Sequence, residues 1–192
     1  MLRAELRIAR SRNTNREVRD TALWYTVFPT AWGFFGVAGD ERGICRTCLP
    51  VPDRDSACRQ LLGGLAQAQN EPGLFADLQS RIVAYFEGEK VEFGMDVPVV
   101  LDGLSDFARQ GLQACRKVEV GQTVTYGQLA ARVGRAQAAR AVGSALARNP
   151  IPLIIPCHRV MCANGQLGGF SAPGGTGLKA RLLRHEHTLG SS

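Results

Sequence analysis

One segment organises the rest of this chain: Ile151-Pro152-Leu153-Ile154-Ile155-Pro156-Cys157-His158-Arg159-Val160, where a thiol follows an apolar, proline-rich run. Pro150, Pro152 and Pro156 fix three φ angles and remove three backbone donors, so no helix can run through the segment. The residues that precede the prolines are pushed toward extended geometry. We therefore expect Cys157 to lie on a rigid extended segment, which is the placement that a nucleophile needs.

Cys157 is followed directly by an imidazole and a guanidinium. Neighbouring cationic groups lower the pKa of a thiol and enlarge its thiolate fraction. Adjacent side chains of an extended segment point to opposite faces, so we expect a bridging water to carry the proton from Cys157 to His158. The imidazole in turn needs an acceptor on its other nitrogen. The alternative is a structural cysteine, because free cysteines are among the most buried residue types.

The chain has 192 residues, 45% of them hydrophobic and 21% charged, which suits one medium domain or two small ones. It contains no apolar run of membrane-spanning length and no secretory signal pattern. We expect a monomeric, cytoplasmic protein (nuclear if the source is eukaryotic) without membrane contact. A formal charge of +6 and a pI near 9.3 favour an anionic partner, nucleic acid first, although such a charge can also serve solubility alone.

The six cysteines do not suggest a disulfide scaffold. Cys45 and Cys48 make a lone C-x-x-C in a strand-like stretch, where positions i and i+3 face opposite ways, and no second Cys/His pair completes a site. His185 and His187 are two positions apart on an expected helix and also point nearly opposite ways. The sequence therefore predicts no metal site and no cofactor.

Patterning divides the chain into three parts. Residues 1–20 carry six arginines and little apolar content, which is typical of a solvated basic arm. Residues 21–97 are expected to form an α/β domain, because short β-prone runs are followed by two helical patterns. The runs, expected as an antiparallel meander, are 24–28, 32–38 and 43–49, and the helices are 56–69 and 74–87, the latter ended by Gly88.

Residues 98–192 are expected to form a second, helical domain. The expected helices are 104–115, 125–132, 136–148 and 176–187. Thr125 is suited to cap the second helix, and a glycine-containing turn at 134–135 leads into the third. A short helix, a tight turn and another helix are the pattern of a helix-turn-helix motif.

The helix at 136–148 is built almost entirely of small residues, among them Ala139 and Gly143, and one long cation, Arg140, projects from it. A helix with small side chains and one long cation suits insertion into the minor groove of DNA better than base reading in the major groove. The alternative is the helix propensity of alanine alone.

The loop at 168–175 has five glycine or proline residues among eight, with Phe170 and Ser171 at its centre. It is suited to close approach of the backbone to a flat ligand. Glu186 falls in the last turn of the final helix, where an acid opposes the helix dipole. This position indicates a role for Glu186 other than helix stability.

Pro156-Cys157-His158-Arg159-Val160, preceded by Arg148-Asn149-Pro150 and followed by the glycine-rich loop and His185-Glu186, resembles the O6-alkylguanine-DNA alkyltransferases, also called methylated-DNA–protein-cysteine methyltransferases. The resemblance runs from about residue 24 to residue 189. It implies an α+β fold of two domains, a small ribonuclease-H-like α/β domain and a helical winged helix-turn-helix domain. It also implies direct-reversal repair of alkylated duplex DNA, bound through the minor groove.

The resemblance further implies roles for the residues of the reacting centre. Cys157 would accept the alkyl group, and His158 would take the thiol proton through a water. Glu186 would orient His158 and balance its charge. Asn149 would tie the turn of the helix-turn-helix to the active-site segment, and Tyr126 would assist rotation of the nucleotide and bond the guanine.

The remaining roles concern the substrate and the DNA. Arg140 would fill the hole left in the base stack, next to Ala139 and Gly143 on the same helix. The backbone carbonyls of Cys157 and Val160 would accept from the guanine amine, and Ser171 would face O6. Phe170 would wall the alkyl pocket, at a position where relatives commonly carry tyrosine.

Physical reasoning leads to the same chemistry. The O6 atom of guanine lies inside the duplex, so a thiolate reaches it only after the base is flipped out. Attack of sulfur on the alkyl carbon leaves a thioether, and the sequence offers no group that would cleave one. We therefore expect one turnover per molecule.

Three other functions are weighed against this one. A non-reactive binder of alkylated DNA would lack the acceptor, whereas Cys157 is present. A Cys–His hydrolase is disfavoured by the helix-turn-helix pattern and by a cysteine adjacent to its histidine. A transcription regulator needs no thiol framed by prolines. The sequence leaves open the preferred alkyl size and whether O4-alkylthymine is accepted.

Overall fold

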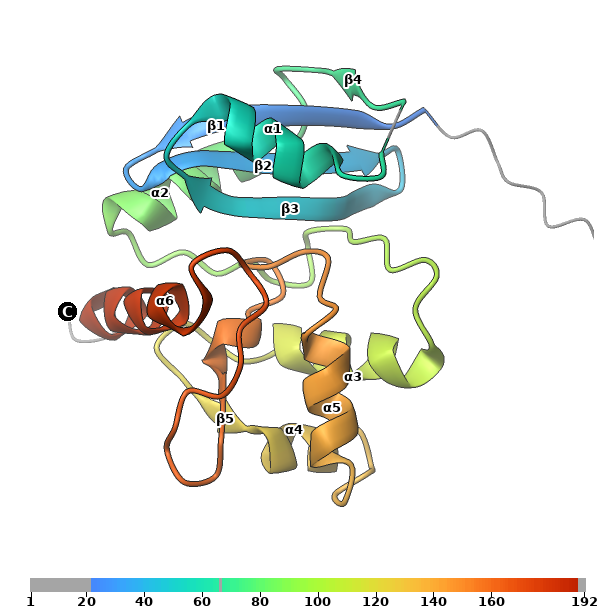
Figure 1. Cartoon of the computed structure of the whole chain (residues 1–192), viewed down its shortest axis with the longest axis vertical. Helices are drawn as coiled ribbons and strands as arrows, with labels where there is room; N and C mark the ends of the chain where they lie inside the picture. Colours follow the sequence, from blue (N-terminus) through green and yellow to red (C-terminus); the bar gives the residue numbers. More distant parts are fainter. Residues whose placement is uncertain (1–21, 66, 190–192) are drawn as a thin grey trace, which may run out of the picture.

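The computed structural model describes residues 22–65 and 67–189, which form a mixed α+β architecture (Figure 1). A sheet with its two helices lies on one side of the molecule, and a mostly helical half lies on the other. The basic arm expected at residues 1–20 lies outside the described residues. Within the described ranges, no helix is long and apolar enough to cross a membrane.

The sheet begins with the antiparallel meander that the sequence predicts, formed by β1 (Trp24–Thr30), β2 (Gly33–Asp40) and β3 (Gly43–Val51). A short strand, β4 (Gln69–Asn70), pairs parallel with β1, so the strand order is β3-β2-β1-β4. Position 43 requires glycine, since its φ is 141° and a Cβ there would lie 2.5 Å from the carbonyl oxygen of Pro98.

Two helices cover opposite faces of this sheet (Figure 1). α1 (Arg54–Leu62) is capped by Asp53, and α2 (Ala76–Glu87) ends at Gly88 in the left-handed conformation, as expected. The prediction of a helix from 56 to 69 was too long. Gly63 and Gly64 follow the end of α1, Gly64 with a φ of 81°, and the chain then returns to the sheet as β4.

Cys45 and Cys48 do not face opposite ways, contrary to the prediction. A register shift between Ala38 and Gly39 disturbs the alternation of β3, and both thiols contact the hydrophobic cluster beneath α1. Both are free thiols. In the part of the chain that the structure describes, no three His, Cys, Asp or Glu side chains are grouped so that they could hold a metal ion.

The second half of the described chain is mostly helical. Its helices are α3 (Asp106–Arg116), α4 (Tyr126–Arg132), α5 (Ala139–Leu146), the 3-10 turn η1 (Cys157–Arg159) and α6 (Gly175–Leu189). Two short strands, β5 (Val124–Thr125) and β6 (Val160–Met161), pair in parallel.

The caps explain where the helices that flank the functional segment begin. Thr125 caps α4, as expected, in a reciprocal capping box with Gln128. α5 begins at Ala139 rather than at residue 136, because the N–H of Ala138 still closes a turn onto the carbonyl of Arg135 at 2.8 Å. α4 and α5 are thus two short helices joined by a turn.

The edge strand β3 joins the two halves. The N–H of Ile44 donates to the carbonyl of Pro98 at 3.0 Å. Pro98 lies in the linker between the halves, so this bond attaches the linker to β3. Farther along β3, the N–H of Thr47 donates to Pro150 at 3.0 Å and its hydroxyl donates to the carbonyl of Pro152 at 2.7 Å. The segment that leads to Cys157 is therefore attached to the sheet.

Candidate active site

Cys157 does not lie on an extended segment, as the prolines led us to expect, but opens the 3-10 turn η1. The prolines exclude an α-helix, yet Pro156 (φ −80°, ψ 63°) leads into a turn in which the Arg159 N–H donates to the Pro156 carbonyl at 2.9 Å. An earlier turn places Leu153 at a φ of 77°, a conformation rare for a residue with a side chain. Residues 153–160 are all buried, which fixes the position of the thiol.

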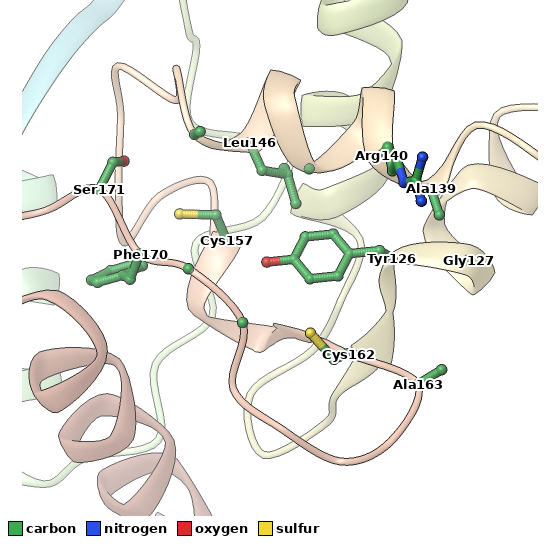
Figure 2. Close-up of a pocket in the computed structure, with 14 residues that line it drawn as sticks. Tyr126, Gly127, Ala139, Arg140, Leu146, Cys157, Cys162, Ala163, Phe170 and Ser171 are labelled. Carbon is green, nitrogen blue, oxygen red and sulfur yellow. The ribbon is translucent and has the colours of Figure 1, made fainter.

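A cavity of about 710 Å³ opens next to Cys157, whose own exposure is only 8% (Figure 2). Seven of the residues expected at the site line this cavity. They are Tyr126, Ala139, Arg140, Gly143, Cys157, Phe170 and Ser171. Figure 2 shows that α4, α5, η1 and the loop at 168–175 contribute them. The fold therefore brings together residues spread over 46 positions of the sequence, from 126 to 171.

His158 and Glu186 form a buried pair behind the cavity wall. The Nε2 atom of His158 lies 2.8 Å from Oε1 of Glu186, and each side chain is 1% exposed. Arg159 also binds this carboxylate, with Nε 2.9 Å from Oε2 and one terminal nitrogen 2.9 Å from Oε1. The hydroxyl of Tyr85 donates to Oε1 at 2.8 Å. The acid that opposes the helix dipole is thus held by three side chains.

These contacts determine the protonation of the pair. Burial alone would raise the pKa of Glu186, but the hydrogen bonds from His158 and Arg159 and the charge of Arg159 outweigh it and hold this pKa well below its ordinary value. Burial lowers the pKa of His158, and Glu186 offsets this only in part. At neutral pH the carboxylate is ionised and the imidazole is neutral.

The tautomer of His158 follows from this state. An ionised carboxylate only accepts hydrogen bonds, so Nε2 must carry the hydrogen that it shares with Glu186. Nδ1 then has a lone pair, and no described residue donates to it. His158 is therefore prepared to accept a proton at Nδ1.

Asn149 contacts the thiol directly. Its side-chain nitrogen donates to the carbonyl of Ile155 at 2.8 Å and to Sγ of Cys157 at 3.3 Å, while its oxygen accepts from the N–H of Ile151 at 3.0 Å. Asn149 follows α5 closely, so it connects the helix pair to the segment that carries the thiol. The amide also stabilises negative charge on sulfur.

Burial raises the pKa of the Cys157 thiol, and the Asn149 hydrogen bond and the charge of Lys179 offset this only in part. The expectation that the flanking cations would lower this pKa was therefore wrong. Arg159 is turned toward Glu186 instead, and His158 is neutral. The buried thiol needs a base to become a nucleophile, which is the role that the neutral imidazole can fill.

Lys179 is a functional candidate that the sequence reasoning missed. It is fully buried on α6, and its Nζ donates to the carbonyl of Val160 at 2.6 Å and lies 5.9 Å from the centre of the Tyr126 ring. Burial lowers its pKa, and the neighbouring Cys157 raises it. The available signal was its spacing, because Lys179 lies seven positions before Glu186, on the same face of the helix.

The Val160 carbonyl was expected to accept from a guanine amine. In the structure one lone pair of this oxygen receives the Lys179 ammonium, which leaves the second for another donor. Tyr126 lies close by, with its ring near two glycines that leave room for it. A Cβ at Gly143 would be 3.7 Å from the ring, and one at Gly168 would be 2.9 Å from the hydroxyl oxygen. Small residues thus shape the cavity around one aromatic side chain.

Comparison with known proteins gives a consistent picture. Residues 106–188 match the family model described as the 6-O-methylguanine DNA methyltransferase DNA-binding domain. A methylated-DNA–protein-cysteine methyltransferase of Cricetulus griseus is 37% identical over 173 residues, which cover 84% of this chain and 81% of the relative. One of the same description from Methanosarcina acetivorans is 34% identical over 171 residues, covering 85% and 98%.

Solved structures extend the likeness to three dimensions. The crystal structure of a Mycobacterium tuberculosis O6-methylguanine methyltransferase superposes with a TM-score of 0.70 at 32% identity, covering 86% of this chain and 93% of the other. A structure of the Mycobacterium tuberculosis protein in complex with DNA gives the same TM-score at 31% identity and the same coverage. The likeness therefore includes the sheet half and the helical half.

Proposed function

This chain belongs to the family of methylated-DNA–protein-cysteine methyltransferases, as its sequence resemblance indicated, and from that premise we propose how its own residues perform the reaction. The protein repairs DNA by moving the alkyl group of O6-alkylguanine to its own cysteine. We assign the acceptor role to Cys157, because its thiol borders the open cavity.

The reaction begins with proton transfer. The Cys157 proton passes by way of a water to Nδ1 of His158, and the ionised Glu186 stabilises the imidazolium that forms. Sulfur then attacks the alkyl carbon, so that an S–C bond forms while the C–O6 bond breaks. The electron pair of that bond stays on the guanine, which takes up a proton as it leaves.

The product explains why each molecule acts once. Cleavage of the thioether would have to expel the Cys157 thiolate, a poor leaving group, and the groups around Cys157 are an amide, a neutral imidazole and a buried ammonium. A base such as His158 does not by itself make the thiolate leave, and none of these groups activates the sulfur as a leaving group. Repair is therefore stoichiometric and ends in irreversible self-inactivation.

The substrate reaches the cavity by base flipping. The cavity of about 710 Å³ is in the size range of small-molecule sites, and a base inside a duplex is otherwise beyond reach of the thiol. Val160 and Cys157 would offer backbone carbonyls to the guanine amine, Ser171 would face O6, and Phe170 would wall the alkyl group. Tyr126 would support the rotated nucleotide from the opposite wall.

We assign DNA contact to α4, the turn and α5, as a winged helix-turn-helix that meets the minor groove. Arg140 is exposed at the rim of the cavity, where it would fill the space left by the flipped base. Ala139 and Gly143 line the same cavity and let the duplex approach closely. We further propose that the sheet half is a ribonuclease-H-like domain, and that the protein acts as a monomer in the cytoplasm, or in the nucleus of a eukaryote.

One observation carries the proposal: a neutral, buried imidazole bonded to an ionised carboxylate lies in the same turn as a thiol that borders an open cavity. It is tested with a duplex that carries a radiolabelled O6-methylguanine. Cys157→Ser should transfer no label but bind the duplex nearly as tightly as the wild type in fluorescence anisotropy.

Cys162 provides the matched control, since it is a second free thiol that lines the same cavity. Cys162→Ser should keep nearly full transfer. Label that persists in Cys157→Ser, or that disappears in Cys162→Ser alone, would show that the acceptor is assigned wrongly. Tight binding without any transfer by the wild type would favour the non-reactive DNA binder instead.

A further inference from the structure

The relay has a contact from the other half of the molecule. Tyr85 belongs to α2 and is fully buried, and its hydroxyl donates to Oε1 of Glu186 across a separation of 101 residues in the sequence. The other donors to this carboxylate in the described chain are His158, Arg159 and, at 3.5 Å, the N–H of Gly121. All of these belong to the helical half.

The Tyr85 ring is held in one orientation. It packs edge-on against Phe86 at 5.0 Å and 89°, and against His185 at 5.1 Å and 71°, with Phe93 at 5.8 Å. His185 also contacts the backbone carbonyl of Tyr85 through Nε2 at 2.6 Å. The hydroxyl therefore cannot leave the carboxylate without repacking of the interface between the two halves.

Tyr85 shares its acceptor atom with the base. Oε1 of Glu186 receives Tyr85, His158 and Arg159 at 2.8, 2.8 and 2.9 Å. Burial and the adjacent charge of Glu186 raise the pKa of Tyr85 well above its ordinary value, so the phenol keeps its proton and only donates. Each hydrogen bond that the carboxylate accepts makes it a weaker acceptor for the imidazolium of His158.

Four other charged or titratable groups lie near the His158–Glu186 pair: Arg159, Lys179, Glu92 and the Cys157 thiol. Arg159 faces Glu186 from η1 and Lys179 acts on His158 from α6. Glu92, in the segment after α2, lies 3.9 Å from Arg159, and the Cys157 thiol precedes His158 in the same turn. The phenol of Tyr85 is a neutral side-chain donor, and its removal leaves all formal charges around Glu186 unchanged.

We propose that Tyr85 is a positioning residue for the proton relay, whose hydroxyl fixes the Glu186 carboxylate and limits how strongly it attracts a proton on His158. The sheet half thereby adjusts the base of the helical half. This inference rests on the proposed function, in which neutral His158 accepts the thiol proton. Without the hydroxyl, Glu186 attracts the imidazole proton more strongly, and His158 becomes protonated at a higher pH.

The test measures the single-turnover rate of methyl transfer with saturating O6-methylguanine duplex from about pH 5 to pH 8, the range in which histidine titrates. Tyr85→Phe keeps the ring and removes the hydroxyl. The acidic limb of its profile should move up by about one pH unit, as expected for loss of one hydrogen bond to a buried charge. The rate should fall several-fold near the acidic end, with a plateau above the limb close to that of the wild type.

Tyr25→Phe is the matched control, because Tyr25 lies on β1 in the cluster beneath α1, away from the relay. Its profile should coincide with that of the wild type. Site-specific replacement of Tyr85 by a difluorotyrosine, which donates more strongly and keeps the shape, should move the limb in the opposite direction. The chain has three histidines, so ¹⁵N NMR with His158→Gln as the assignment standard can follow the His158 ring directly.

The outcomes separate the two proposals. Absence of transfer by the wild type contradicts the proposed function itself. Transfer by the wild type, with an acidic limb that His158→Gln removes but Tyr85→Phe leaves in place, contradicts the role of Tyr85 alone. A Tyr85→Phe profile that is lowered evenly at every pH, with an unchanged His158 titration by NMR, would show that the residue only stabilises the fold.

Discussion

Replacement of Glu186 by glutamine removes one buried negative charge and almost no volume. In the native protein this carboxylate is the partner of the buried Arg159 guanidinium, through two contacts of 2.9 Å, and of His158 at 2.8 Å. Glu186→Gln leaves the guanidinium without its buried charge partner, and only the half-exposed Glu92 remains, 3.9 Å away. Loss of one partner of a buried pair typically costs about 3–5 kcal/mol. The single variant should therefore lose about this much unfolding free energy in urea denaturation.

The same substitution should also slow the chemistry. An amide does not stabilise the imidazolium that forms at His158, and loss of general-base assistance typically costs about 10²- to 10⁴-fold in rate. The expected result is a protein that binds alkylated duplex but transfers the methyl group at least about a hundredfold more slowly in single turnover.

A double variant separates stability from catalysis. In Arg159→Met with Glu186→Gln, no charge is left unpaired, so most of the lost stability should return, whereas the relay is still broken. The transfer rate should stay as low as in Glu186→Gln. Recovery of the rate together with the stability would refute the reasoning, as would a single variant that loses less than about 1 kcal/mol.

Three further predictions concern the contact of Arg140 with duplex DNA, the reactivity of the thiol and the pH dependence of stability. Arg140→Ala should slow repair of duplex DNA far more than attack on free O6-methylguanine, measured as the ratio of the two rate constants, and equal losses would remove its role as a plug. Lys179→Met replaces a fully buried ammonium by an apolar chain, so it should raise the melting temperature. It should also slow methyl transfer, because the positive charge that partly offsets the effect of burial on the Cys157 pKa is lost. A variant that transfers faster than the wild type would contradict this. The folded state holds His158 with a lowered pKa, so below about pH 6.5 the unfolded chain binds a proton that the folded one does not, and unfolding free energy should fall as the pH decreases toward the folded pKa. His158→Gln should flatten that part of the stability curve, and an unchanged curve would show that His158 is not buried in its neutral form.

Local patterns predicted much of the secondary structure. The β-meander was predicted from short apolar runs between turns. Thr125 was identified as an N-cap because its hydroxyl can accept from the first turn of the helix, and Gly88 as a C-cap because glycine adopts the left-handed conformation readily. Element lengths were less predictable. α1 and α5 are both shorter than their sequence patterns, because the glycines after Leu62 and a turn onto Arg135 end or delay the helix before periodicity does.

The contacts within the site were less predictable from the sequence than the identity of its main residues. The local sequence singled out Cys157, His158 and Glu186, the resemblance assigned their roles, and the structure brings the last two into contact. Tyr85 was not found, because on α2 it has the spacing of a core aromatic and its partner lies in the other half of the chain. Arg159 was assigned to the thiol because they are close in sequence, yet the 3-10 turn directs it to Glu186.

The direction of the thiol pKa was wrong for a related reason. Charges near Cys157 can be read from the sequence, but the depth at which the thiol is buried cannot, and here burial outweighs the nearby cations. Lys179 is the complementary case, a cation that the sequence reasoning did not single out and that the fold buries against the Val160 carbonyl.

The central claim is that Cys157 permanently accepts one alkyl group. Trypsin should separate the two thiols of the cavity, since cleavage after Arg148 and Arg159 leaves Cys157 in the peptide 149–159 and Cys162 in the next one. After incubation with excess O6-methylguanine duplex, mass spectrometry should find one methyl group per protein molecule, carried by the peptide 149–159. Repaired duplex in many-fold excess over protein, or a methyl group on the Cys162 peptide instead, would contradict the account.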